Sequence, residues 1–351
     1  MKMKAAMLRG LNDFRIEEID RPVPGPGEVL VKVMAAGVCG SDIHKMQTEW
    51  TRAIPMVLGH EFAGEIVEVG PGVTSHTVGE RMCAAHLVPC GHCEHCREGR
   101  YSLCEDYKLF GGHLFGGFEQ YVIVPEGNVV PIDDNVSYEE AAMVEPLAVA
   151  AHGVMGLRPR LGDTVAVFGL GTIGVLTAQL LRLSGAGRII GIDIDPVKLE
   201  DALAYGVTDT VDPAAGDVEA QVMELTGGRG VDIAIECAGS PVCEEQALLI
   251  TAKGGTVAYQ GIAYRDVTLS RRAFENIFRR EYTIRGFWNS YSAPFPGREW
   301  THSAQLIDEG RVRLTDLITH RYDLDDIQEA FDLAVHRKEP YGKIMIFPNG
   351  R

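Results

Sequence analysis

Four cysteines lie within a stretch of fifteen residues, CGHCEHCREGRYSLC, at positions 90–104. They are Cys90, Cys93, Cys96 and Cys104, so their spacing is C-x2-C-x2-C-x7-C. Such a cluster could form two disulfides, a nucleic-acid-binding zinc module, a redox centre or a zinc site that stabilises part of an enzyme. The stretch alone does not distinguish these alternatives.

A second set of metal-ligating side chains is spread over the first part of the chain. GVCGSDIHK contains Cys39, LGHEFAGEIVEVG contains His60 and Glu61, and MVEPLAVAAHG contains Glu145. One cysteine, one histidine and one or two glutamates suit an open zinc site, in which the protein ligands leave a position for substrate or water. Taken singly, each residue has a structural alternative as a buried thiol, a core histidine or a helix cap.

A glycine-rich turn, VAVFGLGTIG, follows a strand-like run and precedes a helical pattern. It places Gly169, Gly171 and Gly174 in G-x-G-x-x-G spacing, and Asp193 ends the next predicted strand. Glycines let the backbone approach a pyrophosphate, and the following helix N-terminus attracts its negative charge. Asp193 is placed to accept hydrogen bonds from the adenosine ribose and to repel a 2′-phosphate, which favours NAD over NADP. The alternative is a structural turn with a solvated aspartate.

Other residues near this turn are assigned to the same cofactor site. Ile173 is expected to present its backbone to the pyrophosphate. Lys198, on the next predicted helix, is expected to approach the adenosine, with a plain surface lysine as the alternative. Three further residues complete the predicted cofactor site: Thr172, Gly261 and Ile262.

The elements that must position these residues change character along the chain. Residues 1–150 contain short β patterns such as EVLVKVMAAG, punctuated by proline and glycine, as in a compact all-β unit. From about residue 160, strand-like runs such as DTVAVFG, RIIGIDID and VDIAIECAG alternate with helical ones. This alternation predicts a parallel, doubly wound sheet, and YTIRGFW should be its last strand. After about residue 290 we expect a loop, a helix and a short β tail, KIMIFP.

Composition restricts the class of protein. The chain has 351 residues, 46% hydrophobic and 23% charged, enough for two globular domains. The net charge of −16 argues against nucleic-acid binding. Neither a signal peptide nor a membrane span is predicted, because the early lysines precede no apolar run and Glu145, Pro146 and His152 interrupt the most apolar window. A cytoplasmic location is therefore expected, and clustered cysteines there more often bind metal than form disulfides.

Together these motifs resemble the zinc-dependent medium-chain dehydrogenases. GVCGSDIH, LGHEFAGEIVEVG, GERM, the four-cysteine stretch, EPLAVAAH and GLGTIG occur in that family's order and cover nearly the whole chain. The resemblance is to the polyol branch, with sorbitol and threonine dehydrogenases, in which Glu145 stands where liver-type alcohol dehydrogenases use a cysteine. It implies an α/β protein with a GroES-like β-rich catalytic domain, a Rossmann domain and an active site in the cleft between them. The implied bounds are 1–152 and 291–351 for the catalytic domain, with a zinc lobe at about 88–106, and 153–290 for the Rossmann domain.

The resemblance also implies two zinc ions per chain. The four clustered cysteines would close a tetrahedral site with no open position, so their zinc is structural. The ligands of the catalytic zinc would be Cys39, His60, Glu61 and Glu145. One thiolate and one glutamate neutralise Zn²⁺, whereas a second carboxylate would leave a negative site that stabilises an alkoxide poorly. We therefore expect one of the two glutamates to exchange with water or substrate during turnover.

The implied reaction is the reversible oxidation of a secondary alcohol to a ketone. Zinc acts as a Lewis acid on the substrate hydroxyl, and hydride passes to the nicotinamide. Ser41 would take the proton and His44 would pass it towards solvent. Asp42 would orient His60, and Glu61 is counted among the catalytic residues as well as the ligands.

The substrate is indicated by one segment, GFWNSYSAPFPGREW, which resembles that of galactitol-1-phosphate 5-dehydrogenases. A phosphate needs several hydrogen-bond donors, and the segment offers four: Asn289, Ser290, Ser292 and Arg298. A plain interdomain loop is the alternative. The predicted function is NAD-dependent oxidation of a polyol or polyol phosphate by a homodimer or homotetramer. The alternatives are a threonine or unphosphorylated sugar-alcohol dehydrogenase, and a zinc-stabilised binding protein on the same fold.

Overall fold

The computed structural model describes residues 1–48, 54–336 and 338–351. The chain divides into two compact units: unit 1 comprises Met1–Ala148 and Ser290–Arg351, and unit 2 comprises Val149–Asn289. The chain first passes from unit 1 to unit 2 within the helix α4 (Val144–Leu157). In the described parts of the chain, the helices lack the combination of length and apolar composition that a membrane crossing requires.

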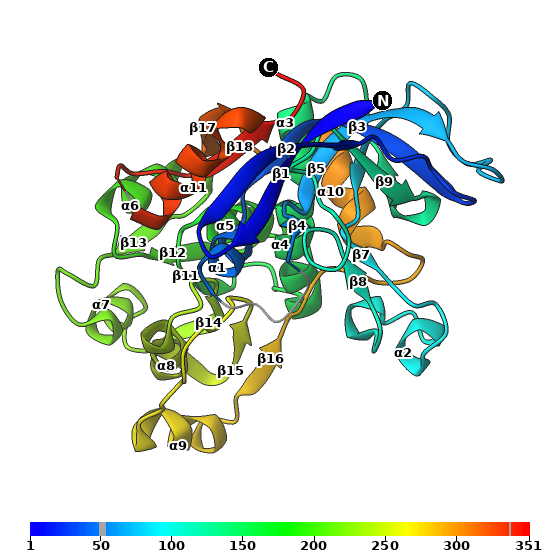
Figure 1. The fold of residues 1–351 in the computed structure, drawn as a ribbon. Coiled ribbons are helices and arrows are strands. Elements are labelled where there is room, and N and C mark those ends of the chain that lie inside the picture. Colours follow the sequence, from blue (N-terminus) through cyan, green and yellow to red (C-terminus); the bar gives the residue numbers. More distant parts are fainter. Residues whose placement is uncertain (49–53, 337) are drawn as a thin grey trace. The chain divides into compact units, whose positions relative to one another are not determined.

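Unit 1 consists mainly of strands, and Figure 1 draws it from blue through cyan into green and then from orange to red. Its largest sheet has seven strands, six of them in the order β10-β6-β5-β3-β18-β17, with β9 pairing with β3. These strands are β3 (Glu28–Gly37), β5 (Glu61–Val69), β6 (Arg81–Ala84), β9 (Tyr121–Pro125), β10 (Val129–Pro131), β17 (Ile318–Asp323) and β18 (Lys343–Phe347). A smaller sheet has the order β2-β1-β4, and β7 pairs with β8. These strands are β1 (Lys2–Gly10), β2 (Asp13–Asp20), β4 (Met56–Val57), β7 (Leu87–Val88) and β8 (Lys108–Leu109).

Aromatic side chains join the sheets and helices of unit 1 into one core. Phe62, Phe118 and Phe331 are each at most 1% exposed and belong to the same apolar cluster. Phe331 lies on a helix, and its ring centroid is 4.7 Å from that of Phe14 on β2. Burying a ring of this size stabilises the fold by about 1.5–3 kcal/mol. The helices of this unit besides α4 are α1 (Gly40–Gln47), α2 (Glu94–Arg97), α3 (Tyr138–Ala142), α10 (Arg298–Asp308) and α11 (Ile327–His336).

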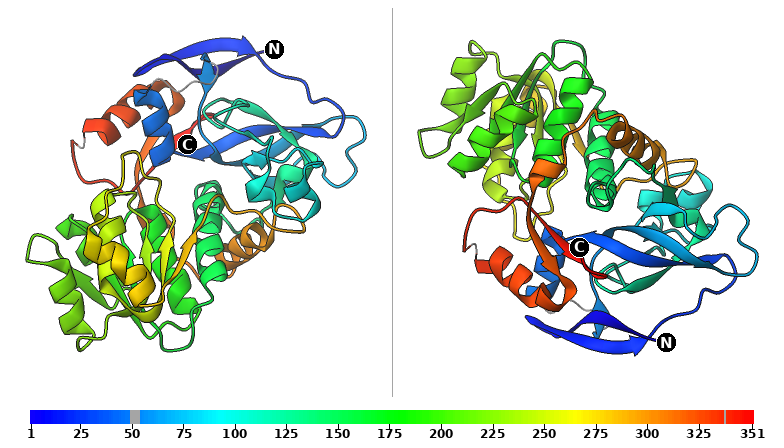
Figure 2. Two further views of the ribbon diagram at one scale, coloured as in Figure 1. Left: turned by 90° about the horizontal axis from the view of Figure 1, so that it is seen from below. Right: turned by 90° about the horizontal axis from the view of Figure 1, so that it is seen from above.

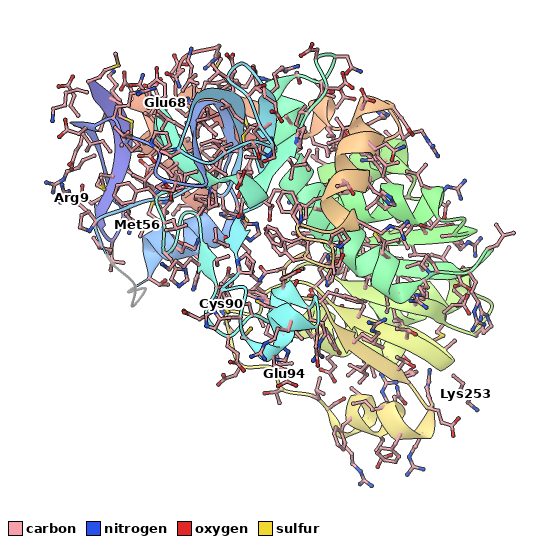
Figure 3. The ribbon with its side chains drawn as sticks, turned by 90° about the vertical axis from the view of Figure 1, so that its right-hand side faces the viewer. Arg9, Met56, Glu68, Cys90, Glu94 and Lys253 are labelled. Carbon is pink, nitrogen blue, oxygen red and sulfur yellow. The ribbon has the colours of Figure 1, made fainter. Side chains whose placement is uncertain are left out.

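The four-cysteine stretch forms a lobe of unit 1 around the short helix α2. Cys90 and Glu94 mark this lobe in Figure 3. Its cysteines make a separate small cluster with two tyrosines, Tyr101 and Tyr107. A four-residue helix and a few loops bury too little apolar surface to be stable alone, so a bound metal is the natural source of its stability.

Unit 2 is a six-stranded sheet with the order β13-β12-β11-β14-β15-β16, and every neighbouring pair is parallel. Figures 1 and 2 show it in green to yellow. Its strands are β11 (Thr164–Phe168), β12 (Arg188–Ile192), β13 (Asp209–Val211), β14 (Val231–Glu236), β15 (Thr251–Tyr259) and β16 (Thr283–Gly286). Its helices besides α4 are α5 (Thr172–Leu183), α6 (Pro196–Ala202), α7 (Val218–Leu225), α8 (Pro241–Ile250) and α9 (Arg271–Arg279). This strand order is the Rossmann order, which confirms the predicted fold class.

The end of the chain holds more structure than the single helix and β tail that the sequence predicts. Two helices, α10 and α11, flank the strand β17, which pairs in parallel with β18. The segment ITHRYD escapes sequence analysis because β17 lies at the edge of its sheet. Only its first residue, Ile318, is buried, so it carries no alternating apolar pattern.

Candidate active site

The glycine-rich turn lies between β11 and α5, as predicted. Gly169 has a φ of +81°, which favours glycine. A Cβ atom at Gly174 would lie 1.8 Å from the carbonyl oxygen of Gly169, so the turn can close only without a side chain there. A Cβ at Gly171 would meet no atom of the described residues within 4 Å, which leaves space before the helix N-terminus. The turn therefore has the free backbone surface that a pyrophosphate needs.

Asp193 follows β12, and its carboxylate is hydrogen-bonded to the backbone of the glycine-rich turn. Its Oδ2 accepts a hydrogen bond from the backbone N–H of Leu170 at 2.7 Å, and its Oδ1 accepts from that of Asp195 at 2.9 Å. Each carboxylate oxygen keeps a second lone pair for a ribose hydroxyl. Asp193 thus shapes the turn, and its contact with the ribose stays a prediction.

The other predicted cofactor residues lie at the same ends of the parallel strands or on the helices that follow them. Thr172 and Ile173 begin α5, and Lys198 lies on α6. Gly261 and Ile262 follow β15, and Ile262 is 43% exposed. Because parallel strands all end at one edge of the sheet, that edge is where a dinucleotide binds in this kind of fold.

Glu236, at the end of β14, is a residue of this edge that sequence analysis missed. It is fully buried and accepts hydrogen bonds from the backbone N–H groups of Ala238 at 2.8 Å and Gly239 at 3.1 Å. A Cβ at Gly261 would lie 2.5 Å from Glu236 Oε2. Burial raises the pKa of Glu236, although these N–H groups oppose the shift. The carboxylate therefore holds the loop after β14, and the backbone carbonyl of Glu236 accepts hydrogen bonds from the N–H groups of Gln260 and Gly261 in the loop after β15.

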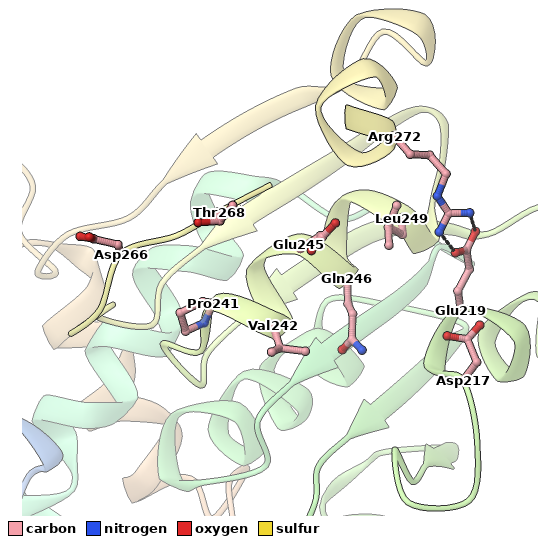
Figure 4. A pocket seen from close by; sticks show the side chains of 10 residues that line it. All are labelled: Asp217, Glu219, Pro241, Val242, Glu245, Gln246, Leu249, Asp266, Thr268 and Arg272. Carbon is pink, nitrogen blue, oxygen red and sulfur yellow. Dashed lines mark hydrogen bonds and ion pairs between the residues drawn. The ribbon is translucent and has the colours of Figure 1, made fainter. Parts of the chain in front are cut away.

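A separate groove of about 480 Å³ in unit 2 contains none of the predicted cofactor residues (Figure 4). Its lining includes Asp217, Glu245 and Asp266, and Arg272 pairs with Glu219. An acidic lining repels a phosphate-bearing ligand, so this groove is not the dinucleotide site.

The predicted catalytic zinc ligands come partly together in unit 1. One ligand atom each of Cys39, His60 and Glu61 lies within 4.8 Å of the others. Cys39 caps the N-terminus of α1, and Glu61 begins β5 opposite Gly37 of β3. The sulfur of the partly buried Cys39, together with a ring nitrogen and a carboxylate oxygen from two buried residues, makes a set of donors that suits Zn²⁺.

Asp42 contacts His60, as predicted. Its side chain is fully buried, with Oδ1 3.3 Å from His60 Nδ1, and its Oδ2 accepts a hydrogen bond of 3.2 Å from the Cys39 backbone N–H. Burial opposes ionisation, but His60 and Lys45 outweigh it and hold the pKa of Asp42 well below its usual range. Burial lowers the pKa of His60, but Asp42 and Cys39 raise it by more. The pKa of His60 therefore lies well above its usual value. The negative charge that attracts a proton to this imidazole would equally favour a metal cation.

Lys343 is a second residue that sequence analysis missed. It is 4% exposed, its Nζ forms an ion pair with Glu61 Oε2, and it donates to the Val38 carbonyl oxygen at 3.1 Å. A Cβ at Gly37 would lie 2.3 Å from Glu61 Oε2, so glycine makes room for the pair. Burial raises the pKa of Glu61, and Lys343 opposes that shift.

Glu145, at the start of α4, lies outside the group formed by Cys39, His60 and Glu61. Its Oε1 is 3.1 Å from Nδ1 of His86, a buried residue that follows β6. Burial would raise the pKa of Glu145, but the contact with His86 and the charge of His60 lower it overall. The two candidate glutamates are therefore unlike: Glu61 is paired with a lysine and Glu145 with a histidine.

The predicted proton-transfer residues Ser41 and His44 both lie on α1. They are three residues apart, so they share one face of the helix. Both side chains are partly exposed. The helix that Cys39 caps thus also carries the two residues assigned to proton transfer.

The four clustered cysteines gather as a metal site would require. All four are free thiols, with one sulfur from each within 4.8 Å of the others. The sulfurs of Cys90 and Cys96 are 3.9 Å apart, far more than the roughly 2.05 Å of a disulfide. Backbone N–H groups of Glu105 and Cys96 lower the pKa of Cys93 to about 6, whereas burial raises that of Cys96 to about 12. A bound metal would deprotonate the remaining thiols.

The predicted substrate segment is only partly open to a ligand. Ser290 is fully buried, and Ser292 donates a 2.6 Å hydrogen bond to Glu299 Oε2. Arg298 is exposed at the first turn of α10. Asn289 belongs to unit 2 and has a φ of 55°. The Ser292 hydroxyl is therefore engaged within unit 1, the buried Ser290 hydroxyl has no hydrogen-bond partner among the described residues, and Arg298 is the accessible charged donor.

The same segment packs against the four-cysteine lobe. Tyr291 donates its backbone N–H to Ser102 Oγ at 3.0 Å. The ring of Phe295 meets that of Tyr101 edge-on at a centroid distance of 5.2 Å. A Cβ at Gly99 would lie 2.5 Å from Cβ of Ala293. These contacts anchor the lobe to the rest of unit 1.

Comparison with known proteins shows which family this chain resembles. An alcohol dehydrogenase GroES-like domain matches residues 25–134, and a zinc-binding dehydrogenase model matches residues 172–308. The chain is 34% identical over 352 residues to the sorbitol dehydrogenase of Bacillus subtilis, covering 99% of this chain and 98% of that protein. It is 34% identical over 357 residues to the L-threonine 3-dehydrogenase of Thermococcus kodakarensis, covering 99% of each.

Solved structures agree with these sequence comparisons. The galactitol-1-phosphate dehydrogenase of Escherichia coli superimposes with a TM-score of 0.94 at 31% identity, covering 99% of this chain and 100% of that one. This full-length agreement confirms the predicted enzyme class, and with it the predicted need for zinc and a nicotinamide dinucleotide. The chain belongs to the zinc-dependent medium-chain dehydrogenases.

Proposed function

We propose that this enzyme uses NAD to interconvert a secondary alcohol of a polyol or polyol phosphate and the corresponding ketose. The observation that carries the proposal is the group of Cys39, His60 and Glu61, with Glu145 held separately by His86. The relatives named for sorbitol and for galactitol 1-phosphate support a polyhydroxyl substrate.

The residues of unit 1 would divide the chemistry between them. Zinc bound by these ligands would polarise the alcohol oxygen and ease loss of its proton. Asp42 holds the imidazole of His60, and Ser41 with His44 offers a path for the proton along one face of α1. Lys343 neutralises part of the charge of Glu61, which eases the burial of this carboxylate beside Cys39 and His60.

The exposed guanidinium of Arg298 is the proposed contact for a terminal phosphate. The test is reduction of a ketose and of its terminal phosphate with NADH, on the parent enzyme and on Arg298→Ala. We expect a higher kcat/KM for the phosphate in the parent, and loss of that advantage in the variant, since a charge-assisted hydrogen bond contributes about 1.5–3 kcal/mol. Equal kcat/KM for the two ketoses in the parent would exclude a phosphate substrate and leave a free polyol.

L-threonine is the second candidate substrate. It is favoured by the 34% identity with an L-threonine 3-dehydrogenase over 99% of both chains. L-threonine is also a secondary alcohol, but it carries an ammonium and a carboxylate group beside the reacting carbon. NAD reduction with L-threonine and with a polyol panel separates the two candidates, because a site shaped for one lacks partners for the other.

We also propose that the enzyme is a homodimer or homotetramer. The strand β16 ends the sheet of unit 2, and all four of its residues are exposed. An exposed edge strand is a natural site for pairing with a second copy.

A further inference from the structure

His86 contacts both an aromatic residue and a candidate zinc ligand through one ring nitrogen. Its Nδ1 is 3.1 Å from Glu145 Oε1 and 3.1 Å from the hydroxyl oxygen of Tyr291. The side chains of His86 and Glu145 are each 7% exposed, and the imidazole also lies 5.4 Å from the ring of His60. Two polar contacts beside the zinc-ligand group give this buried histidine a role beyond filling space in the core.

The directions of these hydrogen bonds follow from what each group can donate. The Tyr291 hydroxyl oxygen accepts from the backbone N–H of Leu87 at 2.9 Å. An ionised carboxylate only accepts, so we assign the ring proton to Nδ1, from which it is donated to Glu145. One carboxylate oxygen is then held by His86, and the other is free to reach a metal ion.

Tyr291 in turn is fixed by the four-cysteine lobe and by its aromatic neighbours. Ser102 of the lobe accepts a hydrogen bond from the Tyr291 backbone N–H at 3.0 Å. The tyrosine ring stacks on Trp300 at 5.5 Å between centroids and on Phe295 at 5.6 Å. The hydroxyl that contacts His86 therefore belongs to a side chain with little freedom.

We infer that His86 is a positioning residue that holds the Glu145 carboxylate for the catalytic metal ion, with the Tyr291 hydroxyl beside the same Nδ1 atom. The inference rests on the zinc site proposed above, but not on which alcohol the enzyme oxidises. Hydrogen-bond partners of metal ligands typically change metal affinity or activity 10- to 100-fold when they are removed.

The test measures release of catalytic zinc to a colorimetric chelator, without substrate. Cys39→Ser identifies the catalytic phase of zinc release, and Cys96→Ser identifies the structural phase. We expect His86→Leu to accelerate the catalytic phase about 10- to 100-fold and to leave the structural phase unchanged. The d–d absorption of cobalt placed in the catalytic site should shift in the same variant.

Two polar variants keep the test decisive if the leucine variant does not fold. The amide nitrogen of asparagine reaches roughly the position of Nδ1, whereas that of glutamine reaches roughly the position of Nε2. His86→Asn should therefore keep slow zinc release and His86→Gln should lose it. Equal release rates in these two variants would overturn the inference.

A matched histidine and glutamate elsewhere in unit 1 supply the control. Nδ1 of His76 is 2.9 Å from Glu80 Oε1, and the His76 side chain is 10% exposed. His76→Leu removes the same kind of contact, so it should lower stability without changing zinc release. If His86→Leu and His76→Leu both lose stability with no change in release, His86 is only structural and the inference fails. A parent enzyme that binds no catalytic zinc would instead refute the proposed function.

Discussion

Individual ligand residues are expected to separate the two zinc sites. Cys39→Ser removes the one thiolate of the catalytic group and should lower kcat by at least about 10³-fold, since Lewis-acid assistance contributes several kcal/mol. Cys96→Ser opens the closed set of four and should chiefly lower the unfolding temperature. Metal analysis should give two zinc ions per chain in the parent and one in each variant. A fully active parent with a single zinc would contradict this assignment.

The sequence predicts the residues of this site whose neighbours along the chain form a motif. Cys39, His60 and Glu61 lie in such motifs, and the structure brings their ligand atoms together. His86 and Lys343 do not, because each reaches its partner only through tertiary structure. Lys343 is 282 residues from Glu61 along the chain, and a contact between such distant residues leaves no local sequence pattern.

Glu119 gives a prediction on pH-dependent stability. The residue is 2% exposed, its Oε2 has no hydrogen-bond partner in the part of the chain that the structure describes, and burial raises its pKa well above the usual range. The folded state therefore favours the protonated carboxyl, and Glu119 costs stability as the pH rises above its unfolded pKa of about 4.5. Glu119→Gln should raise the free energy of unfolding by about 1–3 kcal/mol at pH 8 and by little at pH 4.

The measurement is urea unfolding of both proteins across that pH range. Glu18→Gln, at an exposed position on β2, is the control and should show no such pH-dependent gain. A gain for Glu119→Gln that is equally large at pH 4 would show that charge is not the cause.

Among the secondary-structure elements, the junction of β12 with the glycine-rich turn should set cofactor preference. Asp193→Ala removes the carboxylate that we expect to face the ribose and to repel a 2′-phosphate. It also removes the acceptor of the Leu170 N–H. The kcat/KM for NAD should fall about tenfold or more, and that for NADP should fall less, so the preference narrows.

The matched control lies two residues further on. Asp195 caps α6 by accepting a hydrogen bond from the Val197 N–H at 3.0 Å. Asp195→Ala should lower stability by about 1 kcal/mol and leave the ratio of the two kcat/KM values unchanged. A parent enzyme that uses both cofactors equally would contradict the role of Asp193.

The same elements show what sequence patterns can and cannot predict. β3 was predicted at Glu28–Gly37, because it is a long apolar run that ends at a glycine, and the structure has these bounds. β17 could not be predicted, because an edge strand with one buried residue needs no apolar alternation. The role of Gly37 also needs the structure, since it depends on Glu61 across the sheet.

At the scale of the whole molecule, unit 2 presents an apolar edge that we expect a second copy to cover. β16 pairs with β15 on one side, and its outer edge has no strand partner among the described residues. Two apolar side chains, one on this strand and one just after it, are exposed: Ile284 by 41% and Trp288 by 46%. Isolated apolar side chains are normal on a surface, but a group beside an open strand edge favours association.

Light scattering at micromolar concentration should therefore give the mass of a dimer or tetramer. Ile284→Lys places a charge on the strand that would meet its symmetry mate, so two like charges would face each other across a two-fold axis. We expect this variant to become monomeric. Val242→Lys, at a 62% exposed position on α8, adds the same charge away from the edge and should leave the mass unchanged. A monomeric parent, or a variant at Ile284 that keeps the parent's mass, would show that β16 is not the interface.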